Sequence, residues 1–220
     1  MVNIVKIKNI KMCWDFFHVH PTNKQRTKIS IEGEFLMDNG ASSYRRFLSG
    51  EKDGLSEIIR TYNDGLIFYI NSLVNNVNTA EELTQDVFAL LIAKKPAFHG
   101  RSSFKTWLYA IARNIAVDHI RHFSKLSDTS VDEMSDLSDS TDLEKRCIHE
   151  EQKIMLHRAI SRLHTEYSQI LYLVYFEGFD NTETAKIIKK TKRQVVKLLY
   201  NAKQALKKEL EKEGFEYEEL

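Results

Sequence analysis

Apolar residues recur with a helical period over much of the chain between residues 44 and 125. A capping box formed by Thr79 and Glu82 predicts that one helix begins there, and Pro96 predicts that it ends just before that residue. The apolar positions of this helix recur at intervals of three and four residues, as one buried face requires: Leu83, Val87, Leu90 and Leu91. Its other side is polar and is expected to face solvent.

A further helix is predicted to begin near Ser102 and Ser103, and it also has two unlike sides. One side is an apolar stripe that we expect to lie in the core: Phe104, Leu108, Ile111, Ile115 and His119. The opposite side is polar and basic, and we expect it to be available to a partner: Thr106, Arg113 and Arg121, flanked by Trp107 and Asn114.

Basic residues are concentrated near the end of the chain, where nine Lys or Arg and no Asp or Glu lie between Thr184 and Lys208. Asp180 and Glu183 predict the start of a short helix that runs through Ile188. A second capping box follows at Thr191–Gln194 and predicts that another helix begins at once. Two helices with so short a break between them are typical of a helix-turn-helix.

The last of these helices has an apolar stripe and a basic, polar outer side. The stripe consists of Val195, Leu199, Ala202 and Leu206, and the outer side carries Arg193, Lys197, Tyr200, Gln204 and Lys208. In a DNA major groove, Lys and Arg would meet phosphates, while Lys197, Tyr200 and Asn201 would reach base edges. A lysine-rich helix that is simply solvated is the alternative, and the capped helix before it favours DNA.

Composition agrees with an all-α protein, because 220 residues contain only two prolines and eight glycines. The formal net charge of +1 argues by itself against binding nucleic acid through bulk charge. That average hides local charge, because every charged residue between Ser127 and Glu144 is acidic. Such a segment buries too little apolar surface to offset its ordering entropy, which predicts a flexible linker.

The chain is therefore expected to form two small helical domains, residues 37–126 and 150–212, joined by an acidic linker at 127–149. An acidic tail follows at 213–220. Residues 1–36 show no sustained helical period and are given no function. Met37 is either an alternative translation start or an ordinary internal methionine.

The chemistry of the chain gives no sign of catalysis. Cys13 and Cys147 form no CxxC or other metal-ligand spacing, and the eight histidines come without a carboxylate pair or a nucleophile elbow. We therefore expect no enzyme, no metal, no cofactor and no small-molecule substrate. The sequence has no membrane-spanning run and no secretion signal, which predicts a cytoplasmic protein.

Two segments carry a resemblance to a known family. Residues 80–88 (AEELTQDVF) and 98–114 (FHGRSSFKTWLYAIARN) strongly resemble region 2 of extracytoplasmic-function sigma factors of the sigma-70 family. Residues 171–179 (LYLVYFEGF) and the helix pair after them look like region 4. The resemblance covers roughly residues 44–212. It implies a transcription initiation factor that binds bacterial core RNA polymerase, recognises the −35 element as duplex DNA, and melts and captures the −10 element.

The resemblance also implies roles for individual residues. Residues expected to bind core polymerase, through its β′ clamp helices, are Glu82, Gln85 and Asp86, and region 4 is expected to meet the β flap. Residues expected at the −10 element are Phe98, Arg101, Lys105, Trp107, Arg113, Asn114 and Arg121, with Phe104 and Trp107 as core or pocket wall rather than stacking surfaces. Residues expected at the −35 element are Arg193, Val196, Lys197, Tyr200, Asn201 and Lys203.

Region 4 departs from the family pattern at several positions. Lys189 stands where a turn glycine is usual, and a lysine is tolerated there if it avoids positive φ. Val196, Leu198 and Asn201 stand where basic residues are frequent, which leaves the −35 sequence open. The family also implies an anti-sigma protein as a possible partner. The alternative function is a helix-turn-helix regulator that binds operator DNA independently of core polymerase.

Overall fold

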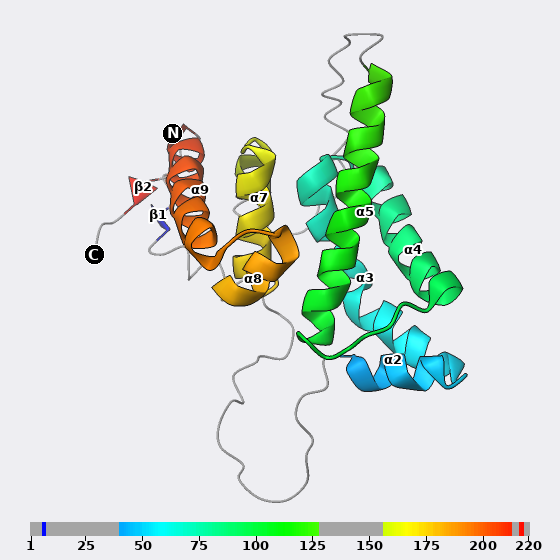
Figure 1. The fold of residues 1–220 in the computed structure, drawn as a ribbon. Helices are drawn as coiled ribbons and strands as arrows, with labels where there is room; N and C mark the ends of the chain where they lie inside the picture. Colours follow the sequence, from blue (N-terminus) through cyan, green and yellow to red (C-terminus); the bar gives the residue numbers. More distant parts are fainter. Residues whose placement is uncertain (1–5, 8–39, 128–155, 213–215, 218–220) are drawn as a thin grey trace, which may run out of the picture.

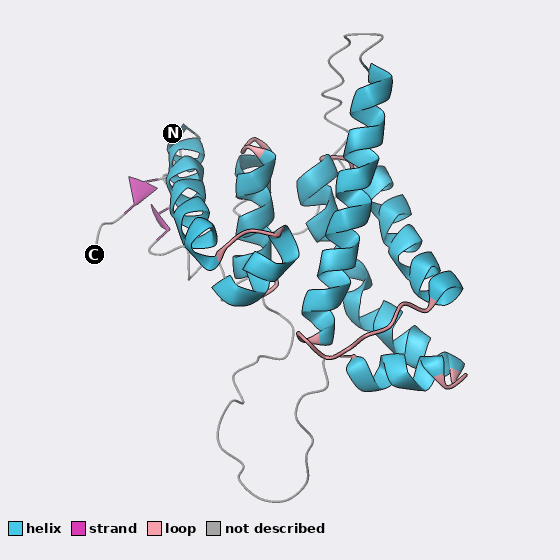
Figure 2. Ribbon diagram, viewed as in Figure 1, coloured by secondary structure: helices cyan, strands magenta, loops and turns pink. Residues whose placement is uncertain are grey.

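The computed structural model describes residues 6–7, 40–127, 156–212 and 216–217 (Figure 1). Several predictions fall outside these residues: the extension 1–36 except for residues 6–7, the start at Met37, the acidic linker at 127–149 except for Ser127, and the two cysteines. Apart from the two-residue strands β1 (Lys6–Ile7) and β2 (Glu216–Tyr217), which pair in parallel, every regular element of the described residues is helical (Figure 2). The predicted all-α fold is confirmed.

The first unit, residues 40–127, is built around one long helix. α3 (Lys52–Val74) packs against α2 (Ala41–Leu48), α4 (Val77–Lys94) and α5 (Phe104–Ser127). The core lies where apolar stripes of α3, α4 and α5 meet, and it includes Leu66, Leu91 and Leu108, each with no exposed surface. The stripe predicted for α4 is buried as expected at Leu83, Val87 and Leu91, with Leu90 half-buried.

The start of α4 corrects one prediction. Thr79 and Glu82 do not cap the helix, because α4 begins two residues earlier, at Val77. Asn76 is the N-cap, and its side-chain oxygen accepts a hydrogen bond from the backbone N–H of Thr79 at 3.0 Å. Asn caps a helix as well as Thr does, so the first suitable side chain after the turn is the one that is used. The predicted end is confirmed, because Lys94 is the last helical residue and Lys95, which precedes Pro96, is the C-cap.

The second unit, residues 156–212, contains the predicted helix-turn-helix. Residues 156–161 are helical and lead to α7 (Thr165–Leu171), which continues as the π-helical turn η1 (Tyr172–Phe176). α8 (Asn181–Ile188) and α9 (Lys192–Lys212) follow, and α9 packs against α7. Figure 1 shows α8 on the side of the second unit that faces the lower part of α5, which it contacts.

Both capping boxes predicted in the second unit are present. The Asp180 side chain accepts hydrogen bonds from the backbone N–H groups of Thr182 and Glu183, and the Glu183 carboxylate accepts one from the backbone of Asp180. The hydrogen bond from the Glu183 backbone N–H, and to a lesser extent the one from Thr182, lowers the pKa of Asp180. Thr191 and Gln194 exchange the equivalent bonds before α9. The local sequence therefore determines where each helix of the motif begins.

The crossing of α2 and α3 requires a glycine. A Cβ atom at Gly54 would lie 2.2 Å from the backbone oxygen of Ser43 and 2.8 Å from the backbone nitrogen of Phe47. Both of these are backbone atoms of α2, so relief would require the two helices to move apart. Gly54 thus sets the separation of α2 and α3.

We predict that Gly54→Ala lowers the free energy of unfolding of the protein by about 1–3 kcal/mol, the usual cost of overpacking a tight contact. Urea titration followed by circular dichroism measures this change. Ser56→Ala is the matched control, because Ser56 is an exposed position of the same helix and Ala favours helix there. Equal stability of the two variants would contradict the close crossing.

Candidate polymerase and nucleic-acid interfaces

One side of α4 presents a polar edge. Glu82, Gln85 and Asp86 are exposed, while Leu83 and Val87 between them are buried. Because Asn76 caps the helix, the Glu82 side chain is not needed for the helix start and is left for a partner. The three residues that sequence reasoning grouped as polymerase-binding thus form one continuous exposed strip on a rigid helix.

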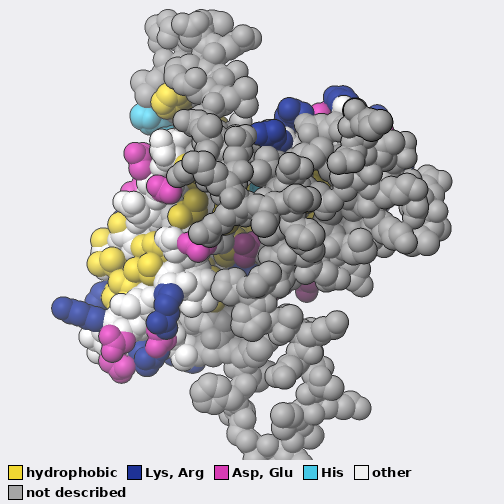
Figure 3. Space-filling model, turned by 180° about the vertical axis from the view of Figure 1, so that it is seen from behind, with side chains coloured by type: hydrophobic (Ala, Val, Ile, Leu, Met, Phe, Trp, Pro, Cys, Tyr) yellow, Lys and Arg dark blue, Asp and Glu magenta, His cyan; other side chains and the backbone are white. Residues whose placement is uncertain are grey.

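Apolar side chains are also exposed on the first unit. Phe68, Val77 and Ile92 each keep about half of their surface exposed. Figure 3 shows hydrophobic side chains gathered on one part of the face that it views, with basic and acidic side chains beyond the patch. A patch of exposed apolar surface such as the one in Figure 3 is typical of protein–protein contact sites.

An aromatic cluster supports the loop before α5. The centre of the Phe98 ring lies 5.6 Å from that of Phe104, edge to face, and 5.4 Å from that of Trp107. The Tyr44 ring packs against the rings of Phe104 and Trp107. Phe104 is buried and Phe98 and Trp107 are half-buried. Phe104 is therefore core, as expected. Phe98 and Trp107 keep part of each ring at the surface.

The polar side of α5 is not wholly available. Arg113 and Asn114 are half-buried, and Arg121 is exposed, with its guanidinium 3.7 Å from the Asp118 carboxylate. Thr106 corrects a prediction, because it is 1% exposed rather than open to a partner. Its hydroxyl donates to the Glu183 carboxylate of α8 at 3.0 Å. The second unit covers this part of α5.

The central contact between the two units is a buried ion pair. The Lys105 ammonium lies 2.9 Å from the Glu177 carboxylate and donates to the Glu177 backbone oxygen at 2.7 Å. The same ammonium lies 4.9 Å from the centre of the Phe179 ring. Only 14% of the Glu177 side chain and 27% of the Lys105 side chain are exposed. Loss of one partner would leave the other charge desolvated.

Other polar contacts surround this ion pair. Ser103 donates to the Glu183 carboxylate at 3.1 Å, and Lys186 donates to the backbone oxygen of Arg101 at 3.1 Å. Deeper in the interface, the Gln169 amide donates to the hydroxyl of Tyr69 at 2.9 Å. The loop before α5 and the first turns of α5 are thus held by α8 and by the turn that precedes it.

Two buried tyrosines complete the contact. Burial raises the pKa of Tyr69 and raises that of Tyr109 well above its ordinary value, and the Glu177 carboxylate beside Tyr109 raises its pKa further. The Tyr109 ring packs edge to face on Phe179 at 5.1 Å. A Cβ atom at Gly65 would lie 2.5 Å from the Tyr109 hydroxyl oxygen and 2.9 Å from a Glu177 oxygen. Gly65 therefore permits this close approach.

The outer side of α9 carries the residues expected to bind duplex DNA. Arg193, Val196, Lys197 and Tyr200 are exposed. Asn201 and Lys203 are half-buried, and the Lys203 ammonium lies 5.2 Å from the centre of the Tyr175 ring of η1. The exposed strip is continuous over the first turns of the helix, as a major-groove contact requires.

The turn between α8 and α9 differs from the expectation. Lys189 adopts a left-handed conformation with φ of +56°, so it does not avoid positive φ. A side chain in that region costs about 1–2 kcal/mol, which the buried packing of α8 and α9 offsets. The backbone N–H of Lys189 donates to the oxygen of Ala185 and closes α8 as a glycine would.

In the part of the chain that the structure describes, no group of three or more His, Cys, Asp or Glu side chains is arranged to hold a metal ion. No helix among those residues is both long and apolar enough to cross a bilayer.

Sequence reasoning missed the carboxylates that join the two units. Glu183 was recognised only as a cap, and Glu177 was part of a matched motif without a role. Nothing local to either residue signals a partner in the other unit. The spacing of 72 residues between Glu177 and Lys105 is visible only in the fold.

Two family descriptions match the chain in the order in which the units occur. The family Sigma-70 region 2 matches residues 58–125, and the family Sigma-70, region 4 matches residues 153–206. Together they cover more than half of the chain. The chain belongs to the sigma-70 family.

Curated relatives refine this assignment. The RNA polymerase sigma factor YlaC of Bacillus subtilis is 26% identical over 163 residues, which cover 73% of this chain and 94% of the relative. The ECF RNA polymerase sigma factor SigX of the same organism is 25% identical over 156 residues, which cover 69% of this chain and 80% of the relative. The chain is thus a sigma factor of the extracytoplasmic-function (ECF) group.

Solved structures share the fold. RpoE of Bartonella quintana, in a complex with the anti-sigma factor NepR, matches with a TM-score of 0.56 and 21% identity over 71% of this chain and 96% of that chain. CnrH, in a complex with the cytosolic domain of CnrY, matches with a TM-score of 0.55 and 16% identity. The match covers 79% of this chain and 95% of CnrH.

In the closed arrangement, the two units are in contact through Lys105 and Glu177, as described above. We predict that Glu177→Gln shifts this sigma factor from the closed arrangement toward separated units. The loss of a charge-assisted contact to a buried Lys105 disfavours closure by about 1.5–3 kcal/mol. Small-angle X-ray scattering of the free protein should show a larger radius of gyration. Glu209→Gln is the matched control, because Glu209 has a similarly covered side chain and pairs with Lys212 inside α9. An unchanged radius for Glu177→Gln would contradict the prediction.

Proposed function

We propose that this protein directs bacterial core RNA polymerase to promoters, with residues 37–126 acting on polymerase and the −10 element and residues 150–212 on the −35 element. The observation that carries the proposal is the ordered pair of region 2 and region 4 matches on two separate helical units. The protein performs no catalysis itself, needs no cofactor or small-molecule substrate, and acts in the cytoplasm where polymerase works.

Core polymerase binds the exposed strip of Glu82, Gln85 and Asp86 in this proposal. Acidic side chains on a rigid helix suit arginines of a partner helix, as the β′ clamp helices would supply, and rim charges of this kind steer association. Exposure of all three side chains supports the role. Region 4 meets the β flap separately, so the two units contact polymerase at two distant places.

The −10 element is captured by the surface around α5. A base leaves the stack at a cost of a few kcal/mol, and stacking on an aromatic ring returns about 1–3 kcal/mol per base. The exposed parts of Phe98 and Trp107 supply ring surface, and the Asn114 amide supplies hydrogen bonds. Phosphates are held by four cations of this surface: Arg101, Lys105, Arg113 and Arg121.

Promoter capture requires the two units to separate. In the closed arrangement Lys105 is occupied by Glu177, and the backbone of Arg101 is bonded to Lys186. Neither the loop before α5 nor its first turns can then be laid along a DNA strand. We propose that polymerase, by binding the two units at separate places, supplies the free energy that separates them.

The −35 element is read by α9 as duplex DNA. Arg193 and Lys203 contact phosphates, and Val196, Lys197, Tyr200 and Asn201 face the bases. Val196 replaces a charge with an apolar group, which suits a thymine methyl in the major groove. The Lys203 ammonium above the Tyr175 ring places this cation beside η1 rather than at the centre of the exposed strip, which is consistent with a backbone contact.

An anti-sigma protein is included among the partners. RpoE of Bartonella quintana, a solved structure with the same fold, is bound to the anti-sigma factor NepR, by the description of that complex. The exposed apolar side chains of the first unit supply a surface for a partner of that kind.

The proposal is tested by mixing the purified chain with core RNA polymerase of Bacillus subtilis and a promoter library. We expect a stable complex with core and transcription from a subset of promoters. The alternative, an operator-binding regulator, predicts sequence-specific binding to duplex DNA without polymerase. Strong specific binding by the chain alone, with no transcription when core is present, would overturn the proposal.

We predict that two sets of substitutions separate polymerase binding from DNA opening. Asn114→Ala should lower open-complex formation about tenfold while core binding stays within about twofold, since it removes hydrogen bonds made only to the extruded base. Gln85→Ala with Asp86→Ala should weaken core binding itself. Permanganate footprinting measures opening, and fluorescence anisotropy measures core affinity. Equal losses in both assays for Asn114→Ala would assign that residue a structural role.

For region 4, we predict that Lys197→Ala changes which −35 sequences are used. A base-edge contact is worth about 1–3 kcal/mol of discrimination, so the preference at one or two base pairs should relax. Selection from a randomised −35 library measures this. Arg193→Ala is the control, because a phosphate contact weakens all sequences about equally. Unchanged selectivity of Lys197→Ala would assign it to phosphate or solvent.

A further inference from the structure

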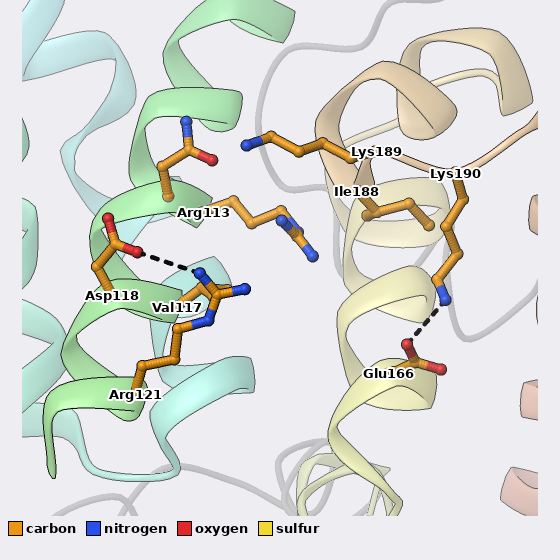
Figure 4. Close-up of a pocket in the computed structure, with 9 residues that line it drawn as sticks. Arg113, Val117, Asp118, Arg121, Glu166, Ile188, Lys189 and Lys190 are labelled. Carbon is orange, nitrogen blue, oxygen red and sulfur yellow. Dashed lines mark ion pairs between the residues drawn. The ribbon is translucent and has the colours of Figure 1, made fainter. Parts of the chain in front are cut away.

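A cavity of about 580 Å³ lies between the two units, beside the interface held by Lys105 and Glu177. Its walls come from both units (Figure 4). α5 contributes Arg113, Asn114, Val117, Asp118 and Arg121, and the second unit contributes Glu166, Ile188, Lys189 and Lys190. Closure of the two units creates this cavity, and their separation removes it.

The charges around the cavity do not balance. It is lined by four basic and two acidic side chains. Both acids already have partners, Asp118 with Arg121 at 3.7 Å and Glu166 with Lys190 at 2.9 Å. This leaves Arg113 and Lys189 without a carboxylate partner among the lining residues. Figure 4 shows these two side chains reaching into the gap from opposite units.

Arg113 has an additional unsatisfied group. Its Nε atom has almost no exposed surface and makes no hydrogen bond to any described residue. A buried guanidinium nitrogen without an acceptor costs free energy, and facing Lys189 across the cavity adds like-charge repulsion. An anion between the two side chains removes this repulsion.

The lining indicates which anion fits. Among the described residues that line the cavity there is no aromatic ring, and Val117 and Ile188 are the only apolar side chains, so these residues offer a nucleobase no stacking surface. Guanidinium, ammonium and amide donors converge from two sides, which suits several phosphate oxygens at once. A single phosphate would fill little of a cavity of this volume, whereas a chain of two or three phosphates reaches both walls.

We infer that this cavity is a binding site for a short phosphate chain, such as pyrophosphate, tripolyphosphate or the phosphates of a nucleotide, held between Arg113 and Asn114 of α5 and Lys189 of the second unit. Such a ligand binds only the closed arrangement, so it stabilises closure by mass action. Because Arg113 and Asn114 belong to the proposed −10 surface, the consequence for transcription rests on the proposed function: the phosphate chain competes with promoter DNA.

Isothermal titration of the full chain tests the site, with pyrophosphate, tripolyphosphate, ATP and sulfate as probes at low ionic strength. We expect tripolyphosphate to bind more tightly than sulfate and to reduce the radius of gyration of any separated fraction. Lys189→Gln should weaken tripolyphosphate binding about fivefold to tenfold, as loss of one charge-assisted contact does, and Lys189→Arg should restore most of it. Lys192→Gln is the matched control, an exposed basic position beyond the cavity.

The probes also distinguish the sources of the phosphate chain. Equal affinity for tripolyphosphate and ATP means that phosphates alone are recognised, and tighter binding of ATP means that its nucleoside contributes. Equal binding of sulfate, or equal losses in Lys189→Gln and Lys192→Gln, would reduce the site to general attraction of anions and overturn the inference. A transcription assay without added phosphates tests the proposed function independently of the phosphate site. If the chain initiates at specific promoters but binds no phosphate chain, the phosphate site is overturned and the proposed function stands.

Discussion

The ion pair between Lys105 and Glu177 is the contact on which the closed arrangement depends. Lys105 belongs to the first turn of α5 and Glu177 follows η1, so this pair joins the two units at the place where α5 begins. The buried tyrosines and the Glu183 contacts are arranged around it. A charge pair with this little exposed surface is retained only while both partners stay in place. It therefore behaves as a two-state contact, either fully made or absent.

The same residues serve opposite purposes in the two states. Lys105 and the loop before α5 are protein contacts in the closed arrangement and, in the proposed function, DNA contacts in the open one. The proposed polymerase contacts are different, because Glu82, Gln85 and Asp86 are exposed in the closed arrangement. In the proposed function, the free protein therefore recognises core enzyme first and promoter DNA afterwards. Such an order limits unproductive binding to the large excess of non-promoter DNA.

Local features of the fold were predictable because they depend on neighbouring residues. The helix-turn-helix, its two capping boxes and the apolar stripe of α4 all follow from side chains within one or two turns of each other. Exposure of Glu82, Gln85 and Asp86 follows from the same period. Contacts between units were not predictable in this way. Thr106 has the position of an outer residue on α5 and is buried only because Glu183 lies against it. Lys189 adopts a positive φ because the packing of α8 against α9 stabilises that turn.

The π-helical turn η1 has a consequence for the geometry of the whole interface. The backbone N–H of Glu177 bonds to the oxygen of Tyr172, five residues back, so the chain carries one residue more than an α-helical turn would. Successive residues of an α-helix are related by a rotation of about 100° around the helix axis. Without the surplus residue, Glu177 would point roughly a quarter-turn away from Lys105. Chain length inside Tyr172–Phe176 therefore sets the direction in which the Glu177 side chain points toward the first unit.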